Sequence, residues 1–238
     1  MEEYRPEQKQ PYTMVATLTG DAKAVFYRKT YTHLALAVLL FILVEVVFFQ
    51  MPGLLNFALS LTQGWTWLLL LGGFMLVTSY AERMALNSHD RNTQYAALLL
   101  YVVAEAFIFI PLIFMGMMYA GDGGMHIISQ AAVVTLSLFL GLSAIVFITK
   151  KDFSFLRSFL TIGFFVALGL IVAGVAFGFN LGLVFSGGMV VLAAGSILYQ
   201  TSNLVHRYSE DQYVAASLGL FASLMLLFWY VLSIFSSD

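Results

Sequence analysis

Cysteine is absent from the 238 residues of this chain. Its absence excludes disulfides, thiolate metal sites and cysteine nucleophiles. Charged residues are also scarce, because they make up only 10% of the chain, whereas an average soluble domain contains about 25%. The net charge is −2 and no basic run stands out. The chain therefore lacks the electrostatic signature of a nucleic-acid-binding protein.

Motifs that are typical of enzymes are missing as well. We find no phosphate-binding glycine loop, no nucleophile elbow and no paired catalytic carboxylates. The four histidines are scattered, without the i, i+4 spacing of a helical metal site; they are His33, His89, His126 and His206. We therefore expect a protein that is not an enzyme and that holds neither a metal nor a cofactor.

Long apolar runs dominate what is present, since 61% of the residues are hydrophobic. A helix needs about 20 residues to cross a bilayer, and backbone groups inside the bilayer must be hydrogen-bonded internally. Seven runs have suitable length and composition, and they cover residues 32–49, 65–80, 95–120, 129–149, 155–177, 181–199 and 213–235. The sequence predicts an all-α membrane protein with a seven-helix transmembrane domain, residues 32–238. A tail, residues 1–31, precedes it and ends in a short amphipathic helix around Val15 to Phe26.

The basic residues predict the orientation of these spans, because short cytoplasmic loops retain lysine and arginine. All eleven precede the first span or lie in or beside the connections between spans two and three, four and five, and six and seven, with Arg157 in the first turn of the fifth span. They are Arg5, Lys9, Lys23, Arg28, Lys29, Arg83, Arg91, Lys150, Lys151, Arg157 and Arg207. This parity predicts a cytoplasmic N-terminus and a C-terminus on the opposite side of the membrane.

Ionisable residues inside spans are the best indicators of function, because each is costly unless it faces water or the bundle interior. Glu105 lies in the middle of the third span, and no basic residue lies at a comparable depth. It is either a proton- or cation-sensitive group in a cavity or a protonated acid bonded to a neighbouring helix. Glu45, near the outer end of the first span, is expected to be interfacial and partly hydrated. Arg83, just after the second span, either turns inward to pair with an acid or extends into the headgroups.

Several segments resemble a known family. They are Ser196–His206, Tyr213–Leu220, the turn Thr149–Leu156, the segment Phe26–Tyr31 that enters the first span, and Glu105 with Pro111, which are separated by five residues. Together they resemble the Bax inhibitor-1/YccA family over nearly the whole chain beyond Phe26. The resemblance implies a seven-helix fold in which the last helix is central and surrounded by the other six.

The resemblance also implies a function, and this sequence departs from the family at the residues that carry that function. The best-understood members are pH-sensitive calcium leak channels, in which two aspartates near the cytoplasmic ends of spans six and seven share a proton. By register these positions fall on Gln200 and about Phe221, and neither residue can ionise. Bacterial YccA-type members resemble this chain more, and they imply a bacterial inner-membrane partner and modulator of the protease FtsH.

Two functional hypotheses therefore remain open from the sequence. The first is a regulatory protein that acts on a membrane protease or another membrane complex. The polar tail would be the segment that the protease binds and pulls. The second is a leak for calcium or protons, motivated by Glu105. A third hypothesis is a bundle that binds a lipid or a hydrophobic small molecule. No residue in the sequence specifically supports it.

Overall fold

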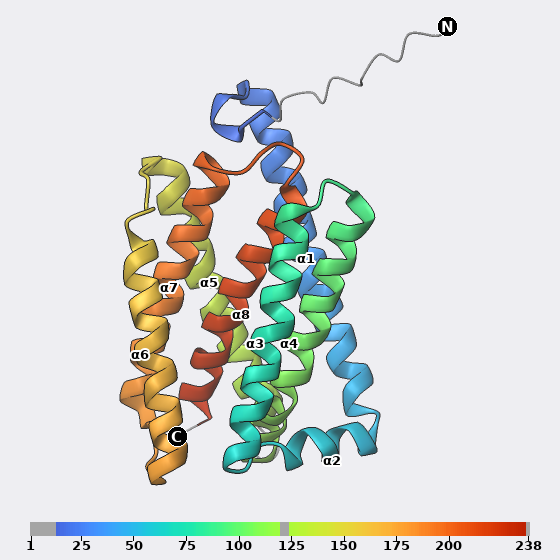
Figure 1. Ribbon diagram of the computed structural model, residues 1–238, viewed down its shortest axis with the longest axis vertical. Coiled ribbons are helices and arrows are strands. Elements are labelled where there is room, and N and C mark those ends of the chain that lie inside the picture. Colours follow the sequence, from blue (N-terminus) through green and yellow to red (C-terminus); the bar gives the residue numbers. More distant parts are fainter. Residues whose placement is uncertain (1–12, 120–123, 237–238) are drawn as a thin grey trace, which may run out of the picture.

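The computed structural model describes residues 13–119 and 124–236. Their helices are η1 (Val15–Thr17), α1 (Gly20–Phe49), α2 (Pro52–Ser60), α3 (Trp65–Asn87), α4 (Arg91–Tyr119), α5 (Gly124–Thr149), α6 (Leu156–Phe177), α7 (Gly182–His206) and α8 (Tyr213–Phe235). Among the described residues, all of the α-helices except α2 are long and apolar enough to cross a membrane, which makes seven. The long helices run side by side, and α2 lies across one end of the bundle (Figure 1). The predicted all-α membrane bundle is confirmed.

The first span begins earlier than the sequence predicts. Instead of a separate amphipathic helix, a 3₁₀ turn is followed by α1, which runs without a break from Gly20 to Phe49. Thr19 caps the helix by accepting a hydrogen bond from the Ala22 N–H at 3.5 Å, and Asp21 in the first turn suits the positive end of the helix dipole. No helix-breaking residue follows, so the cap determines where the helix begins.

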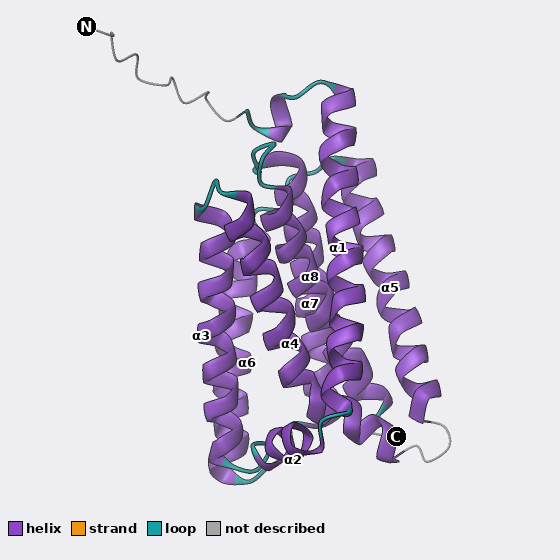
Figure 2. Ribbon diagram, turned by 90° about the vertical axis from the view of Figure 1, so that its right-hand side faces the viewer, coloured by secondary structure: helices purple, strands orange, loops and turns teal. Residues whose placement is uncertain are grey.

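The short helix α2 replaces the loop expected between the first two spans. Pro52 occupies the start of this helix, where its missing N–H costs no hydrogen bond. Nine residues are too few to cross a bilayer, and α2 lies roughly perpendicular to the long helices (Figures 1 and 2). The segment therefore forms a helix at the edge of the bundle without adding a crossing.

Helix α8 is the centre of the bundle. It packs against α1, α3, α4, α5 and α7, and most of its residues are buried. The predicted central position of the last helix is confirmed, but the ring around it is less complete than expected. Helix α6 packs mainly against α7 on the outside of the bundle.

The two ends of the bundle differ in charge. The start of α1 and the loops α3–α4, α5–α6 and α7–α8 share one end (Figure 1). Within the described ranges, every lysine and arginine belongs to these loops or to the adjoining helix turns. We call this end the basic end. Helix α2, the α6–α7 turn and the end of α8 lie at the opposite end.

Candidate functional site

Glu45 is buried inside the bundle. Only 6% of its surface is exposed, and neither carboxylate oxygen has a hydrogen-bond partner among the described residues. The sequence predicts a partly hydrated interfacial group, and the structure differs. Glu45 follows Phe41 by four residues on the face of α1 that is buried, and residues at this spacing share one face of a helix.

Glu105 is buried in α4, with 5% of its surface exposed and its Oε2 atom unpaired among the described groups. An acid of α3, Glu82, lies within electrostatic range of the Glu105 carboxyl. The hydroxyl of Tyr101 lies within range of both acids. Glu82 was missed in the sequence, because the second apolar run ends near residue 80, whereas α3 continues to Asn87.

The two buried acids belong to different places in the bundle. Phe41 of α1 and Phe109 of α4 meet edge to face, with ring centroids 5.3 Å apart. Both helices run away from the basic end, and Glu105 precedes Phe109 by one turn, whereas Glu45 follows Phe41 by one turn. Four positions on α4 and four on α1 thus separate Glu105 from Glu45, and eight positions correspond to about 12 Å along the helix axes. The phenylalanine contact therefore separates Glu105 from Glu45.

Gln200 faces α8, but the residue opposite it is not Phe221. A Cβ atom placed on Gly219 would lie 3.1 Å from Gln200 Oε1, and one turn further along, the hydroxyls of Ser196 and Ser223 are 2.8 Å apart. Phe221 is fully buried and instead contacts the rings of Phe41 and Tyr101. Two residues along a helix correspond to a rotation of about 200°, so Phe221 points away from the face of α8 that Gln200 contacts.

Neither side of this α7–α8 contact carries an acid. Its residues are Ser196, Gln200, Gly219 and Ser223, and none of their side chains ionises near neutral pH. Arg83, the remaining predicted residue, is exposed on α3, and no salt bridge joins it to another described residue. The four predicted site residues, Glu45, Arg83, Glu105 and Gln200, therefore do not form one cluster.

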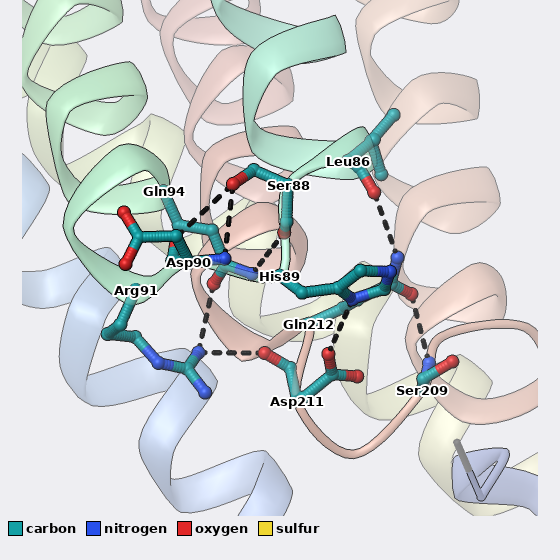
Figure 3. Close-up of polar contacts among 9 residues, drawn as sticks. All are labelled: Leu86, Ser88, His89, Asp90, Arg91, Gln94, Ser209, Asp211 and Gln212. Atoms are coloured by element: carbon teal, nitrogen blue, oxygen red, sulfur yellow. Dashed lines mark hydrogen bonds and ion pairs between the residues drawn. The ribbon is translucent and has the colours of Figure 1, made fainter. Parts of the chain in front are cut away.

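A polar cluster at the basic end was not predicted from the sequence. Arg91 donates from Nη1 to the carbonyl oxygen of Asp211 at 2.7 Å and to Gln94 Oε1 at 2.9 Å. Its guanidinium lies over the ring of Tyr213, 4.2 Å from the centroid. Gln212 donates to the carbonyl of Leu86 at 3.2 Å. The cluster ties the α3–α4 loop to the α7–α8 loop (Figure 3).

The segment before α1 is bound to the same α7–α8 loop. The Val15 N–H donates to the Tyr208 carbonyl at 2.9 Å, and the Glu210 N–H donates to the Thr13 carbonyl at 3.1 Å. Val15 is fully buried, and burial raises the pKa of the Tyr208 hydroxyl. The chain is thus fixed to the bundle immediately after residue 12. Hydropathy gives no signal for such a contact, because it depends on backbone groups.

Comparison with known proteins agrees with this architecture. Residues 23–238 match the family described as "Inhibitor of apoptosis-promoting Bax1". Bax inhibitor 1 of Schizosaccharomyces pombe is 28% identical over 228 residues, which cover 93% of this chain and 80% of the relative. "Modulator of FtsH protease YccA" of Escherichia coli is 35% identical over 117 residues, which cover 49% of this chain and 53% of the relative.

An uncharacterized protein of Pseudomonas aeruginosa is 42% identical over 120 residues, which cover 50% of this chain and 54% of the relative. The chain spans about half the length of such bacterial relatives in the matched segments. The family match, in contrast, extends from the first turns of α1 to the last residue. The chain belongs to the Bax inhibitor-1 family of multi-pass membrane proteins.

Proposed function

We propose that this chain is a bacterial inner-membrane regulatory partner of a membrane-anchored FtsH-type protease, with its basic end in the cytoplasm. The name of its Escherichia coli relative, a modulator of the FtsH protease, supports this role. The orientation is supported by the position of the lysines and arginines at one end of the bundle, because cytoplasmic loops retain these residues.

The observation that carries the proposal is the contact between the N-terminal segment and the α7–α8 loop. Two backbone hydrogen bonds join Thr13 and Val15 to this loop, and the loop leads directly into the central helix α8. A protease that grips residues 1–12 would pull first on these bonds and then on the start of α8. Engagement of the tail would thus reach the core of the bundle.

Removal of residues 2–12 tests the proposal, because the deletion leaves Thr13 and Val15 in place. We expect the full chain to co-purify with an FtsH-type protease from bacterial membranes, and recovery of the truncated chain to fall to background. A variant with residues 2–12 replaced by a glycine-serine stretch of equal length separates sequence from length. Equal recovery of the full and truncated chains, with both inserted in the membrane, would contradict the proposal.

A cation or proton leak is the second candidate, and Glu105 supports it. This acid is buried without a described cationic partner, and another acid, Glu82, lies within electrostatic range of it. We expect the intact chain in liposomes to pass calcium or protons, and Glu105→Gln to reduce the flux. Glu210→Gln, the same substitution at an exposed residue of the α7–α8 loop, serves as the control. Equal and negligible flux from the intact chain and Glu105→Gln would exclude this function.

A further inference from the structure

A cavity of about 590 Å³ lies between α1, α4, α5 and α8, in the half of the bundle toward α2. Its inner wall is formed by buried apolar residues that include Phe41, Leu224 and Met225. The volume falls within the range of about 300–1,000 Å³ that is typical of small-molecule sites. The cavity is therefore large enough for a ligand with a sizeable apolar body.

The cavity opens sideways between α1 and α5. Near the basic end these helices are held together by Tyr27 and Phe147, whose ring centroids are 5.2 Å apart. They diverge toward the opposite end (Figure 2). Ile42 and Val46, which line the cavity on α1, are 50% and 52% exposed. Because these rim residues are apolar, the mouth faces the hydrocarbon of the bilayer.

Three polar residues line the otherwise apolar cavity: Gln50, which is exposed at the end of α1, and Glu45 and Thr135, which are buried. Glu45 is 6% exposed and Thr135 is 2% exposed. The two carboxylate oxygens of Glu45 and the hydroxyl oxygen of Thr135 have no hydrogen-bond partner among the described residues. Leaving buried polar groups unpaired costs free energy, and the cost is largest for a charged group. The cavity thus presents three oxygens without a partner, all of which can accept a hydrogen bond from a ligand.

No described lysine or arginine pairs with this carboxylate. The described lysines and arginines lie at the basic end, and none of them lines the cavity. A bound fatty acid would place a second carboxylate against Glu45, and a neutral alkyl chain would leave all three oxygens unpaired. An ammonium group, by contrast, has N–H donors and the opposite charge.

We propose that this cavity binds a hydrophobic amine, with its ammonium group paired to Glu45 and its apolar body among the side chains of α1, α4, α5 and α8. The ammonium donates to the Glu45 carboxylate and to the Thr135 hydroxyl. The rings of Phe41 and Phe228 line the same cavity and attract a desolvated cation. The ligand enters from the membrane between α1 and α5. This site is independent of the proposed contact with a protease.

Equilibrium binding of tritiated dodecylamine to the full chain in phosphatidylcholine nanodiscs tests the proposal, with empty nanodiscs subtracted. We expect saturable binding of one amine per chain. Glu45→Gln should weaken it by about tenfold or more, because a charge-assisted pair is lost. Glu210→Gln makes the same change in the α7–α8 loop, outside the cavity, and should leave the affinity unchanged.

Two further measurements keep the test decisive if Glu45→Gln fails to fold. Dodecanol has the same apolar body without the charge, and we expect it not to displace the amine at equal concentration. Ala132→Phe adds bulk to the cavity lining on α5 and should abolish binding. Equal displacement by dodecanol would show that the cavity binds alkyl chains without regard to charge, and it would overturn the proposal. Undiminished binding to Glu45→Gln, or no saturable binding above empty nanodiscs, would overturn it as well.

Discussion

Gln200 of α7 lies directly against Gly219 of α8, so that a Cβ atom on Gly219 would be 3.1 Å from Gln200 Oε1 and 3.2 Å from its Cδ. The contact joins the central helix to the helix with which it packs most extensively. Gln200 is also one of the two positions at which the resemblance implies an ionisable residue. A glutamine amide does not ionise near neutral pH, so this contact cannot act as a proton-sharing pair.

Substitution of Gly219 tests this packing. Gly219→Ala should not raise the free energy of unfolding, although alanine has a higher helix propensity than glycine. The added methyl group displaces the Gln200 amide. In a Gln200→Ala background the same substitution should be better tolerated, with a coupling free energy of about 1 kcal/mol. Unfolding in mixed detergent micelles measures both values. Gly141→Ala, where nothing lies within 4 Å, is the control, and strictly additive effects would contradict the contact.

Arg91 should stabilise the basic end much more than Arg83. Arg91→Ala removes two hydrogen bonds and the contact with Tyr213, and we expect it to lower the free energy of unfolding by about 1–3 kcal/mol. Arg83→Ala removes an exposed side chain and should change it by less than about 0.5 kcal/mol. Arg91→Lys should be intermediate, because an ammonium lacks the planar fork of the guanidinium. Equal effects of the two alanine substitutions would show that the cluster is not stabilising.

Asp90 should make the stability of α4 depend on pH in the acid range. The Thr93 hydroxyl and backbone N–H donate to Asp90 Oδ2 at 2.7 Å and 2.8 Å, and these hydrogen bonds lower the pKa of Asp90. A lowered pKa contributes stability above the ordinary value of about 4. This contribution is lost as the pH falls through the lowered pKa of the folded state.

We therefore expect Asp90→Ala to lower the unfolding midpoint at pH 7 and to differ less from the parent chain in acid. Asp90→Asn retains an acceptor for the Thr93 donors without a titrating group, so it should lose less stability at pH 7. Unfolding curves between about pH 3 and pH 7 measure this difference. A constant gap between Asp90→Ala and the parent chain over that range would refute the assignment.

Val15 should control the binding of the N-terminal segment to the α7–α8 loop. Val15→Asp places a charge at a fully buried position, so the segment should detach while the seven spans remain folded. Hydrogen exchange at the Glu210 amide, which donates to the Thr13 carbonyl, should then accelerate. Ala16→Asp changes an exposed neighbour and should leave that exchange slow. If both variants exchange at the parent rate, the segment does not depend on Val15.

The spans were predictable because they depend on consecutive residues: an apolar run predicts a crossing, and the charges beside it predict its orientation. A run such as residues 213–235 must be hydrogen-bonded internally in the bilayer, and the predicted bounds of the last span agree with α8. The second span was predicted too short, because Glu82 and Arg83 lower the hydropathy of the last turns of α3. The polar residues at a helix end do not terminate the helix unless they also cap it.

Contacts between helices were not predictable in the same way. The contact of Gln200 with Gly219, and the position of Glu45 in the cavity that Thr135 also lines, depend on how each helix is rotated about its axis. A single sequence contains no direct record of that rotation. The bonds from Thr13 and Val15 to the α7–α8 loop involve backbone atoms, so side-chain identity does not indicate them.

The proposed regulatory role requires the basic end to face the cytoplasm, and cysteine labelling measures this directly. The chain contains no cysteine, so a single introduced cysteine reports one position without background. Gln63→Cys marks the exposed α2–α3 turn, and Lys151→Cys marks the exposed α5–α6 loop at the basic end. With a membrane-impermeant maleimide on intact spheroplasts, we predict labelling of Gln63→Cys at once and of Lys151→Cys only after lysis. Labelling of Lys151→Cys in intact spheroplasts would place residues 1–12 beyond the reach of a cytoplasmic protease and contradict the proposal.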